Sequence, residues 1–198
     1  MSKPDLHLAS ASPRRRELLS ALGLSFSCGG VDVDESPLAG ESVSDLVLRL
    51  ACSKAQTAAD TGDYTIPVLG ADTIVVLGDR VFGKPGSKEE ALNMLASLSG
   101  CTHEVLTGVA VMANNELETA MSLTEVQFRE IHPDEAEAYW QSGEPAGKAG
   151  AYAVQGLGGI FVSGVKGSYT GVVGLPVFET AALLRRAGIA LPAIADHR

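Results

Sequence analysis

The segment PVLGADTIVVL at residues 67–77 constrains the fold of this chain more than any other. Small, apolar and β-branched residues stand on both sides of a single polar pair, Asp72 and Thr73. Such a run is typical of a strand that is buried on both faces, because the residues on each face must find apolar neighbours. We therefore expect a buried strand, interrupted at Asp72, in a sheet that is covered by helices.

Helical and strand-like segments alternate along the chain. Helices that start at a capping residue or a proline are expected at residues 13–22, from 42 past 54, and at 88–98, 133–140 and 176–187. Strands are expected at residues 6–8, 24–28, 67–77, 104–113 and 116–129, and the glycine-rich segment 143–174 is also strand-like. A hairpin turn at Asn114 and Asn115 makes two of these strands antiparallel. The predicted fold class is therefore α/β, with a mixed twisted β-sheet flanked by helices.

Composition and charge exclude several classes of protein. The three cysteines are far apart and show no CxxC spacing, so neither a disulfide framework nor a thiolate zinc site is expected. No apolar run approaches the roughly 20 residues of a membrane span, and no secretory signal is recognisable. A net charge of −9 repels polyanions and argues against nucleic-acid binding. We expect one soluble, cytoplasmic domain over residues 1–198, without membrane or nucleic-acid partners and frayed after Leu191.

The segment LASASPRRR at residues 8–16 places hydroxyl and guanidinium groups where a strand runs into the start of a helix. A helix N-terminus exposes unpaired N–H groups, and Ser10, Arg14 and Arg15 could add further donors to phosphate oxygens. Cations oppose the macrodipole at this end of a helix, which favours an anion bound between them. The alternative is a solvated basic first turn. The segment is not a Walker A loop, because GxxxxGK[ST] is absent.

Two carboxylates could take part in phosphate chemistry. Glu35 lies in the acidic loop segment GVDVDES at residues 30–36, whose oxygen atoms suit a hard cation such as Mg²⁺, although many acidic loops are only solvated. Asp72 stands in an apolar strand, where it could act as a general base or make a structural hydrogen bond. Lys54 ends the apolar face of its helix and needs a partner, and Lys84 in FGKPG is a further cation. Either lysine could instead extend to water.

Taken together, the short motifs resemble those of the Maf family of nucleotide pyrophosphatases over residues 8–184. The motifs are LASASPRR (8–15), DES (34–36), RLACSKA (49–55), GADT (70–73), GKP (83–85), LSGCTHEV (98–105), SGEP (142–145), KAGAYAVQGLGG (148–159) and VVGLP (172–176). The resemblance implies two lobes around a central cleft, in a fold similar to that of the inosine triphosphate pyrophosphatases. Gly147 and Gly171 depart from the family, whose members often carry Asp and Asn there.

The resemblance also implies an activity and a set of site residues. The activity is metal-assisted hydrolysis of dTTP and UTP to the monophosphate and pyrophosphate, with Asp72 as proton acceptor and a divalent cation, Mg²⁺ or Mn²⁺, held by Glu35 and Asp72. The residues that would contact the triphosphate are Ser10, Arg14, Arg15, Lys54 and Lys84. Arg14, Thr73 and Gln155 match the branch that acts on dTTP and UTP, and the Gln155 amide could read a pyrimidine edge.

Two other functions stay open at this point. One is the sister specificity of the family for 7-methyl-GTP, and the other is a non-catalytic regulator of septum formation that binds a nucleotide or a protein. The family also leads us to expect a homodimer. Its members are associated with the removal of non-standard pyrimidine triphosphates and with restraint of cell division.

Overall fold

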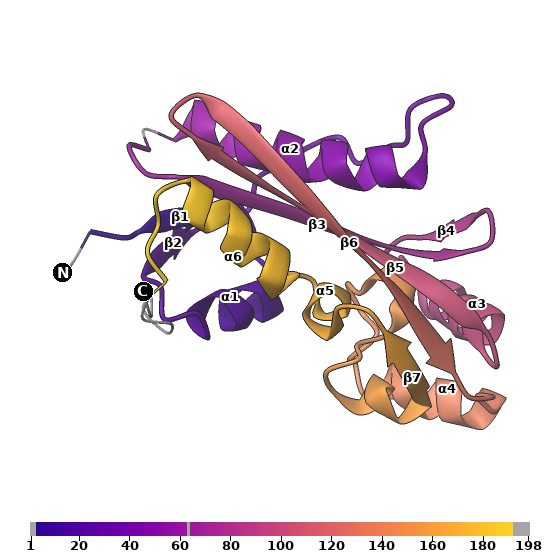
Figure 1. Ribbon diagram of the computed structural model, residues 1–198. Helices are drawn as coiled ribbons and strands as arrows, with labels where there is room; N and C mark the ends of the chain where they lie inside the picture. Colours follow the sequence, from indigo (N-terminus) through magenta and orange to yellow (C-terminus); the bar gives the residue numbers. More distant parts are fainter. Residues whose placement is uncertain (1–2, 63, 192–198) are drawn as a thin grey trace. The chain divides into compact units, whose positions relative to one another are not determined.

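The computed structural model describes residues 3–62 and 64–191 (Figure 1). The strands are β1 (Leu6–Leu8), β2 (Phe26–Cys28), β3 (Val68–Leu77), β4 (Arg80–Phe82), β5 (Thr102–Ala113), β6 (Glu116–Phe128) and β7 (Val162–Lys166). The helices are α1 (Pro13–Ser20), α2 (Val43–Thr61), α3 (Lys88–Leu98), α4 (Pro133–Gln141), α5 (Tyr169–Val173) and α6 (Val177–Arg186), with 3-10 turns η1 (Ala149–Ala151) and η2 (Leu157–Phe161). No helix within the described ranges is long and apolar enough to cross a membrane. The fraying predicted after Leu191 lies outside them.

The strands form one mixed sheet in the order β2-β1-β3-β5-β6-β7, with β4 paired to β3. β1 is parallel to both β2 and β3, whereas β4 is antiparallel to β3 and β7 is antiparallel to β6. Asn114 and Asn115 both have positive φ angles, of 52° and 64°, in the turn between β5 and β6. This backbone conformation suits a two-residue hairpin turn. The prediction of a mixed sheet flanked by helices is confirmed.

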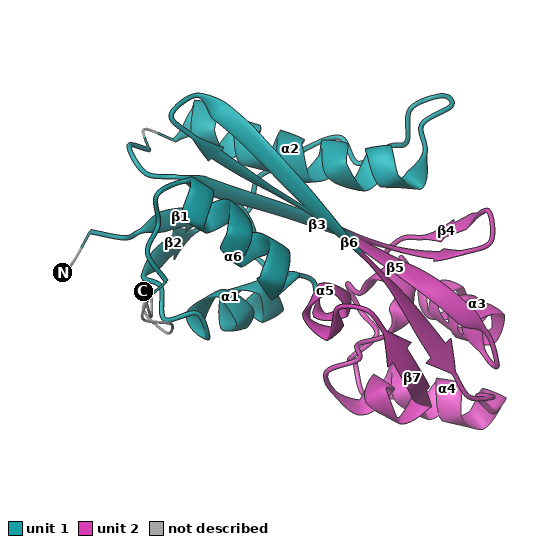
Figure 2. Ribbon diagram, viewed as in Figure 1, with its two compact units in different colours: residues 1–72, 107–122, 174–198 teal, residues 73–106, 123–173 magenta. Residues whose placement is uncertain are grey.

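The chain divides into two compact units, shown in different colours in Figure 2. Unit 1 contains residues 1–72, 107–122 and 174–198, and unit 2 contains residues 73–106 and 123–173. Strands β3, β5 and β6 each contribute residues to both units. The single domain over residues 1–198 and the cleft between two lobes stay predictions.

In unit 1, helices cover both faces of the sheet: α2 lies on one face, and α1 and α6 on the other (Figure 1). Leu69 and Ala71 of β3 belong to the cluster that contains the buried leucines of α1 and α6. Val68 alternates with these residues along the strand, and it packs with Ala58 of α2 instead. Because side chains alternate along a strand, Gly70 and Asp72 share the face of β3 that Val68 presents to α2.

Helix α2 lies unusually close to the sheet because two glycines face it. A Cβ atom on Gly70 would lie 2.3 Å from the carbonyl oxygen of Ala51, and one on Gly108 would lie 2.7 Å from that of Val47. Any larger residue at either position would push α2 away from the strands. The helix itself begins as predicted, with the Ser42 hydroxyl accepting a hydrogen bond from the N–H of Asp45 at 3.1 Å.

Unit 2 has its own core, in which α3 and α4 pack with aromatic residues of β6 and the 3-10 turns. His103 of β5 is 1% exposed and lies edge-on to the rings of Phe128 and Tyr152. Its Nε2 atom is 2.8 Å from the Tyr152 hydroxyl, whereas its Nδ1 atom is buried and has no hydrogen-bond partner among the described residues. The imidazole is therefore an integral part of an apolar core.

Two expectations about secondary structure are wrong, and one strand was not predicted. β3 runs through Asp72 without interruption, because the carboxylate is paired rather than expelled from the strand. β4, which pairs back onto β3 after the Gly78 turn, was not expected. The segment 143–174 is mostly 3-10 turns and loops, with one strand, β7, and the short helix α5. Its glycines with positive φ angles, among them Gly143, Gly150 and Gly156, break any extended ladder.

Replacing Gly70 with Ala is expected to lower the free energy of unfolding by about 1–3 kcal/mol, the usual cost of overpacking a dense interior. The new methyl group would overlap the α2 backbone at the Ala51 carbonyl. Urea unfolding monitored by circular dichroism measures the change. Gly29→Ala is the matched control, because its Cβ atom would have no neighbour nearer than 3.7 Å. Equal stability of the two variants would contradict the close approach of α2.

The buried His103 should make the protein sensitive to mild acid. Burial lowers the pKa of His103 from 6.5 to about 4, so the unfolded chain takes up this proton first as the pH falls. We expect the parent protein to lose about 2 kcal/mol of unfolding free energy between pH 7 and pH 5 through this residue. His103→Gln should lose correspondingly less over the same interval, as measured by urea unfolding at both pH values. Parallel losses in the two proteins would show that His103 does not carry this effect.

Candidate active site

The start of α1 carries the hydroxyl and guanidinium groups that the sequence predicted for an anion site. β1 leads into the helix through Ser10 and Ser12, and Ser12 is the N-cap residue, with Pro13 in the first turn. The first turn contains no acidic residue that would neutralise the helix dipole. The Ser10 hydroxyl accepts a hydrogen bond from the N–H of Ser12 at 3.2 Å and is buried. The predicted strand-to-helix arrangement of LASASPRRR is confirmed.

Arg15 points back from α1 toward the carboxylates of unit 1. Its Nε donates to the carbonyl oxygen of Gly174 at 2.8 Å, and its Nη1 donates to the Ser10 hydroxyl at 3.4 Å. Burial lowers the pKa of Arg15, and the neighbouring Arg14 adds to this effect, while the charges of Asp72 and Glu35 oppose it. The guanidinium therefore lies within electrostatic reach of both carboxylates, which joins the arginine-rich turn to the predicted catalytic residues.

Lys54 connects the two carboxylates directly. Its Nζ atom lies 2.6 Å from Asp72 Oδ1 and 2.6 Å from Glu35 Oε1. Lys54 and Asp72 are each only 8% exposed, whereas the Glu35 side chain is nearly half exposed. A buried ammonium is stable only when it is paired and hydrogen-bonded. The prediction that Lys54 needs a partner is thus confirmed, and both of its partners are predicted site residues.

The acidic loop that carries Glu35 is attached to α2 by residues that the sequence analysis missed. Arg49 donates to the Glu41 carboxylate at 2.6 Å and to the carbonyl oxygen of Ser36 at 2.9 Å. The hydrogen bonds from Arg49 lower the pKa of Glu41 to about 2. Asp34 accepts from the N–H of Ser36 at 2.9 Å, which closes a local turn. The sequence signal that could have indicated a role for Arg49 is its position at the start of the RLACSKA motif.

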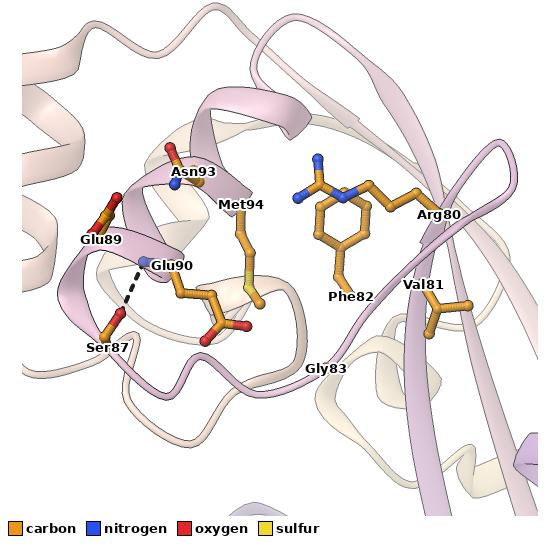
Figure 3. A pocket seen from close by; sticks show the side chains of 9 residues that line it. All are labelled: Arg80, Val81, Phe82, Gly83, Ser87, Glu89, Glu90, Asn93 and Met94. Atoms are coloured by element: carbon orange, nitrogen blue, oxygen red, sulfur yellow. Dashed lines mark hydrogen bonds between the residues drawn. The ribbon is translucent and has the colours of Figure 1, made fainter. Parts of the chain in front are cut away.

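In unit 2, the loop that carries Lys84 is held at both ends. The carbonyl oxygen of Gly83 accepts from the N–H of Gly150 at 3.1 Å, and the Glu90 carboxylate accepts from the N–H of Gly86 at 2.8 Å. A pocket of about 320 Å³ lies along this loop, lined by β4 and α3. Figure 3 shows the Glu90 carboxylate in this pocket, with the Arg80 guanidinium over the ring of Phe82. Lys84 itself is exposed.

The structure brings together within unit 1 the predicted residues Ser10, Arg14, Arg15, Glu35, Lys54 and Asp72. Thr73, Lys84 and Gln155 belong to unit 2. Thr73 follows Asp72 directly in β3 and is half-buried, and Gln155 is exposed just before η2. The meeting of these three residues with those of unit 1 stays a prediction.

The carboxylates fit a divalent cation that is shared with a substrate. No three His, Cys, Asp or Glu side chains in the described part of the chain gather into a metal-binding group. However, Glu35 and Asp72 each direct one oxygen at the same ammonium group, so the two carboxylates can coordinate a single cation. Mg²⁺ commonly takes only one or two protein carboxylates and completes its shell with water and phosphate oxygens. The donor set therefore suits such an ion only when the phosphate is also present.

Comparison with known proteins gives consistent matches over nearly the whole chain. The family described as Maf-like protein matches residues 5–187. The dTTP/UTP pyrophosphatase of Bordetella avium is 50% identical over 197 residues, covering 96% of this chain and 98% of the relative. The dTTP/UTP pyrophosphatase of Methylococcus capsulatus is 50% identical over 184 residues, covering 93% and 91%.

Among solved structures, the nucleoside-triphosphatase, or dITP/XTP pyrophosphatase, of Mycobacterium abscessus is similar over 62% of this chain and 72% of its own. The TM-score is 0.39 and the sequence identity is 15%. This likeness is too slight to bear on the fold.

Proposed function

Because this chain belongs to the Maf family, we propose that it is a nucleoside triphosphate pyrophosphatase that hydrolyses dTTP and UTP. The products are the nucleoside monophosphate and pyrophosphate. Relatives that are about 50% identical over nearly their full length bear the name dTTP/UTP pyrophosphatase, which supports this substrate class. The observation that carries the proposal is the joint placement of Arg15, Lys54, Glu35 and Asp72 in unit 1.

The basic residues bind the triphosphate in this mechanism. The Ser10 hydroxyl and the guanidinium of Arg15 would donate to the phosphate oxygens, and Arg14 extends the same surface. Lys54 loses part of its pairing with Glu35 and Asp72 when phosphate oxygens arrive, and it then donates to them. Lys84 would add a further positive charge. Hydrolysis of a phosphate anhydride depends mainly on such positioning and charge neutralisation.

Asp72 accepts the proton of the attacking water. Its Oδ1 atom is hydrogen-bonded to Lys54, so we assign the proton to Oδ2. The water oxygen forms a bond to the α-phosphorus, the bond from that phosphorus to the bridging oxygen breaks, and pyrophosphate leaves. Glu35 and Asp72 would hold a divalent cation, Mg²⁺ or Mn²⁺, which supplies further neutralisation of the phosphate charge. The Asp72 side chain is buried, which limits the access of bulk water to its carboxylate.

Base selection is the finer part of the proposal. The Gln155 amide carries both a donor and an acceptor and can therefore pair with the edge of a pyrimidine. Thr73 and Arg14 would limit the size of the base pocket. We further propose, from family membership, a cytoplasmic homodimer that removes non-standard pyrimidine triphosphates or restrains cell division.

A panel of triphosphates tests the substrate class. We expect pyrophosphate release from dTTP and UTP to exceed release from 7-methyl-GTP and ATP by at least about tenfold in kcat/KM, the discrimination that a few fixed contacts can supply. Excess chelator should abolish release, and added Mg²⁺ or Mn²⁺ should restore it. Preference for 7-methyl-GTP would indicate the sister specificity. Tight nucleotide binding without any product would indicate a non-catalytic regulator.

Asp72→Asn tests the proton acceptor. The amide cannot take the proton from water, so kcat for dTTP should fall by about a hundredfold or more. Asp79→Asn, at an exposed turn, is the control and should keep the parental rate. Thermal unfolding should show that both variants fold, since Lys54 keeps its contact with Glu35 in the first of them. A parental rate for Asp72→Asn would remove this residue from the mechanism.

A further inference from the structure

Gln155 stands in a loop whose backbone is held by hydrogen bonds on both sides of it. On the N-terminal side, the N–H of Ala153 donates to the Tyr139 hydroxyl at 3.1 Å. On the C-terminal side, the N–H groups of Leu157 and Gly158 donate to the two oxygens of the Glu144 carboxylate, at 3.0 Å and 2.9 Å. Gln155 is exposed between these anchors. All of these residues belong to unit 2.

The two anchors are themselves joined. The Tyr139 hydroxyl, which accepts from Ala153, donates to Glu144 Oε1 at 2.7 Å. Tyr139 is 4% exposed and its ring packs edge-on against Phe161. Tyr139 therefore has little freedom, and its hydroxyl and the Glu144 carboxylate form one continuous clamp around the loop. Charge-assisted hydrogen bonds of this kind are roughly twice as strong as neutral ones.

The glycines of the loop allow this close contact. Gly156 has a φ angle of 144°, and a Cβ atom there would lie 2.3 Å from Glu144 Oε2. A Cβ atom on Gly158 would lie 2.4 Å from the Tyr139 hydroxyl. Only glycine fits at either position, so the two glycines of the QGLG sequence are needed for the loop to contact Glu144 and Tyr139. Burial acts to raise the pKa of Glu144, but hydrogen bonds from Gly158, Tyr139 and Leu157 outweigh it and keep the carboxylate charged.

We infer that Glu144 and Tyr139 are positioning residues for base selection. They hold the Gln155 loop in one conformation before the nucleotide binds, so that the Gln155 side-chain amide meets the pyrimidine edge without a further ordering step. The inference rests on the proposed function, in which Gln155 reads the base. A loop ordered in advance costs less free energy to bind, and a fixed amide discriminates between bases better than a mobile one. Neither Glu144 nor Tyr139 is required to touch the nucleotide.

Glu144→Gln and Tyr139→Phe test the clamp with minimal change of shape. UTP and CTP are the substrates to compare, because they differ only at the base edge. We expect each variant to lower the UTP-to-CTP ratio of kcat/KM by about tenfold, mainly through a higher KM for UTP, as lost preorganisation predicts. Glu137→Gln is the matched control, because Glu137 lies on α4 in an exposed ion pair with Lys88.

A double-mutant cycle with Gln155→Ala separates positioning from general stability. If the clamp acts through Gln155, then Glu144→Gln should not lower the ratio further once Gln155 is Ala. A merely structural role would lower activity equally in both backgrounds. Amide hydrogen exchange gives a readout without substrate. The backbone N–H groups of Leu157 and Gly158 should exchange faster in Glu144→Gln than in the parent, and at the parental rate in Glu137→Gln.

The possible outcomes distinguish this inference from the proposed function. A parent protein that fails to hydrolyse UTP overturns both. If the parent hydrolyses UTP and Gln155→Ala lowers the ratio, but both clamp variants keep the parental ratio, the inference alone is overturned. A parental ratio in Gln155→Ala overturns it as well, because there would be no base contact to position. Should Glu144→Gln fail to fold, Tyr139→Phe decides by the same measurements.

Discussion

The ammonium group of Lys54, held between Glu35 and Asp72, is the interaction on which the rest of the site depends. It brings a helix, a strand and a loop to one point, and the buried charges of Lys54 and Asp72 would be unstable there alone. The two carboxylates and the ammonium together leave a net negative charge, which the guanidinium of Arg15 on α1 balances. Because two carboxylates hold the ammonium, a divalent cation can take its place at the same oxygen atoms, as the proposed hydrolysis requires.

Packing in unit 1 supports this charge cluster. The glycines Gly70 and Gly108 let α2 approach the strands to backbone contact, which sets the distance between Lys54 and Asp72. On the opposite face, the leucines of α1 and α6 fill the space beneath β1, β3 and β5. Because α1 is fixed by this apolar contact, its N-terminus and Arg15 are also fixed. In unit 2, by contrast, the loops that carry Lys84 and Gln155 are held by hydrogen bonds from their backbone N–H groups to carboxylates.

Much of the fold and part of the site could be predicted from local patterns. Helix starts at Pro13, Ser42 and Ser87 followed from capping chemistry, and the β5–β6 hairpin followed from its Asn-Asn turn. The segment 143–174 could not be predicted in this way. Its glycines were compatible with strands, and only contacts with Glu144, Tyr139 and Val75 determine the turns that they adopt. Arg49, Glu41 and Glu144 were missed for a related reason: their partners are distant in sequence or are backbone groups.

By itself, the sequence determined which groups had to be neutralised: a lone aspartate in an apolar strand, a lysine on an apolar helix face and arginines at a helix start. The apolar neighbours of the aspartate and the lysine in sequence predict burial, where an unpaired charge is costly, and cations at a helix start favour a bound anion. Only the tertiary structure decided which group pairs with which. The partners of Lys54 lie 18 and 19 residues away along the chain, and the choice depends on sheet order and on the depth at which α2 packs.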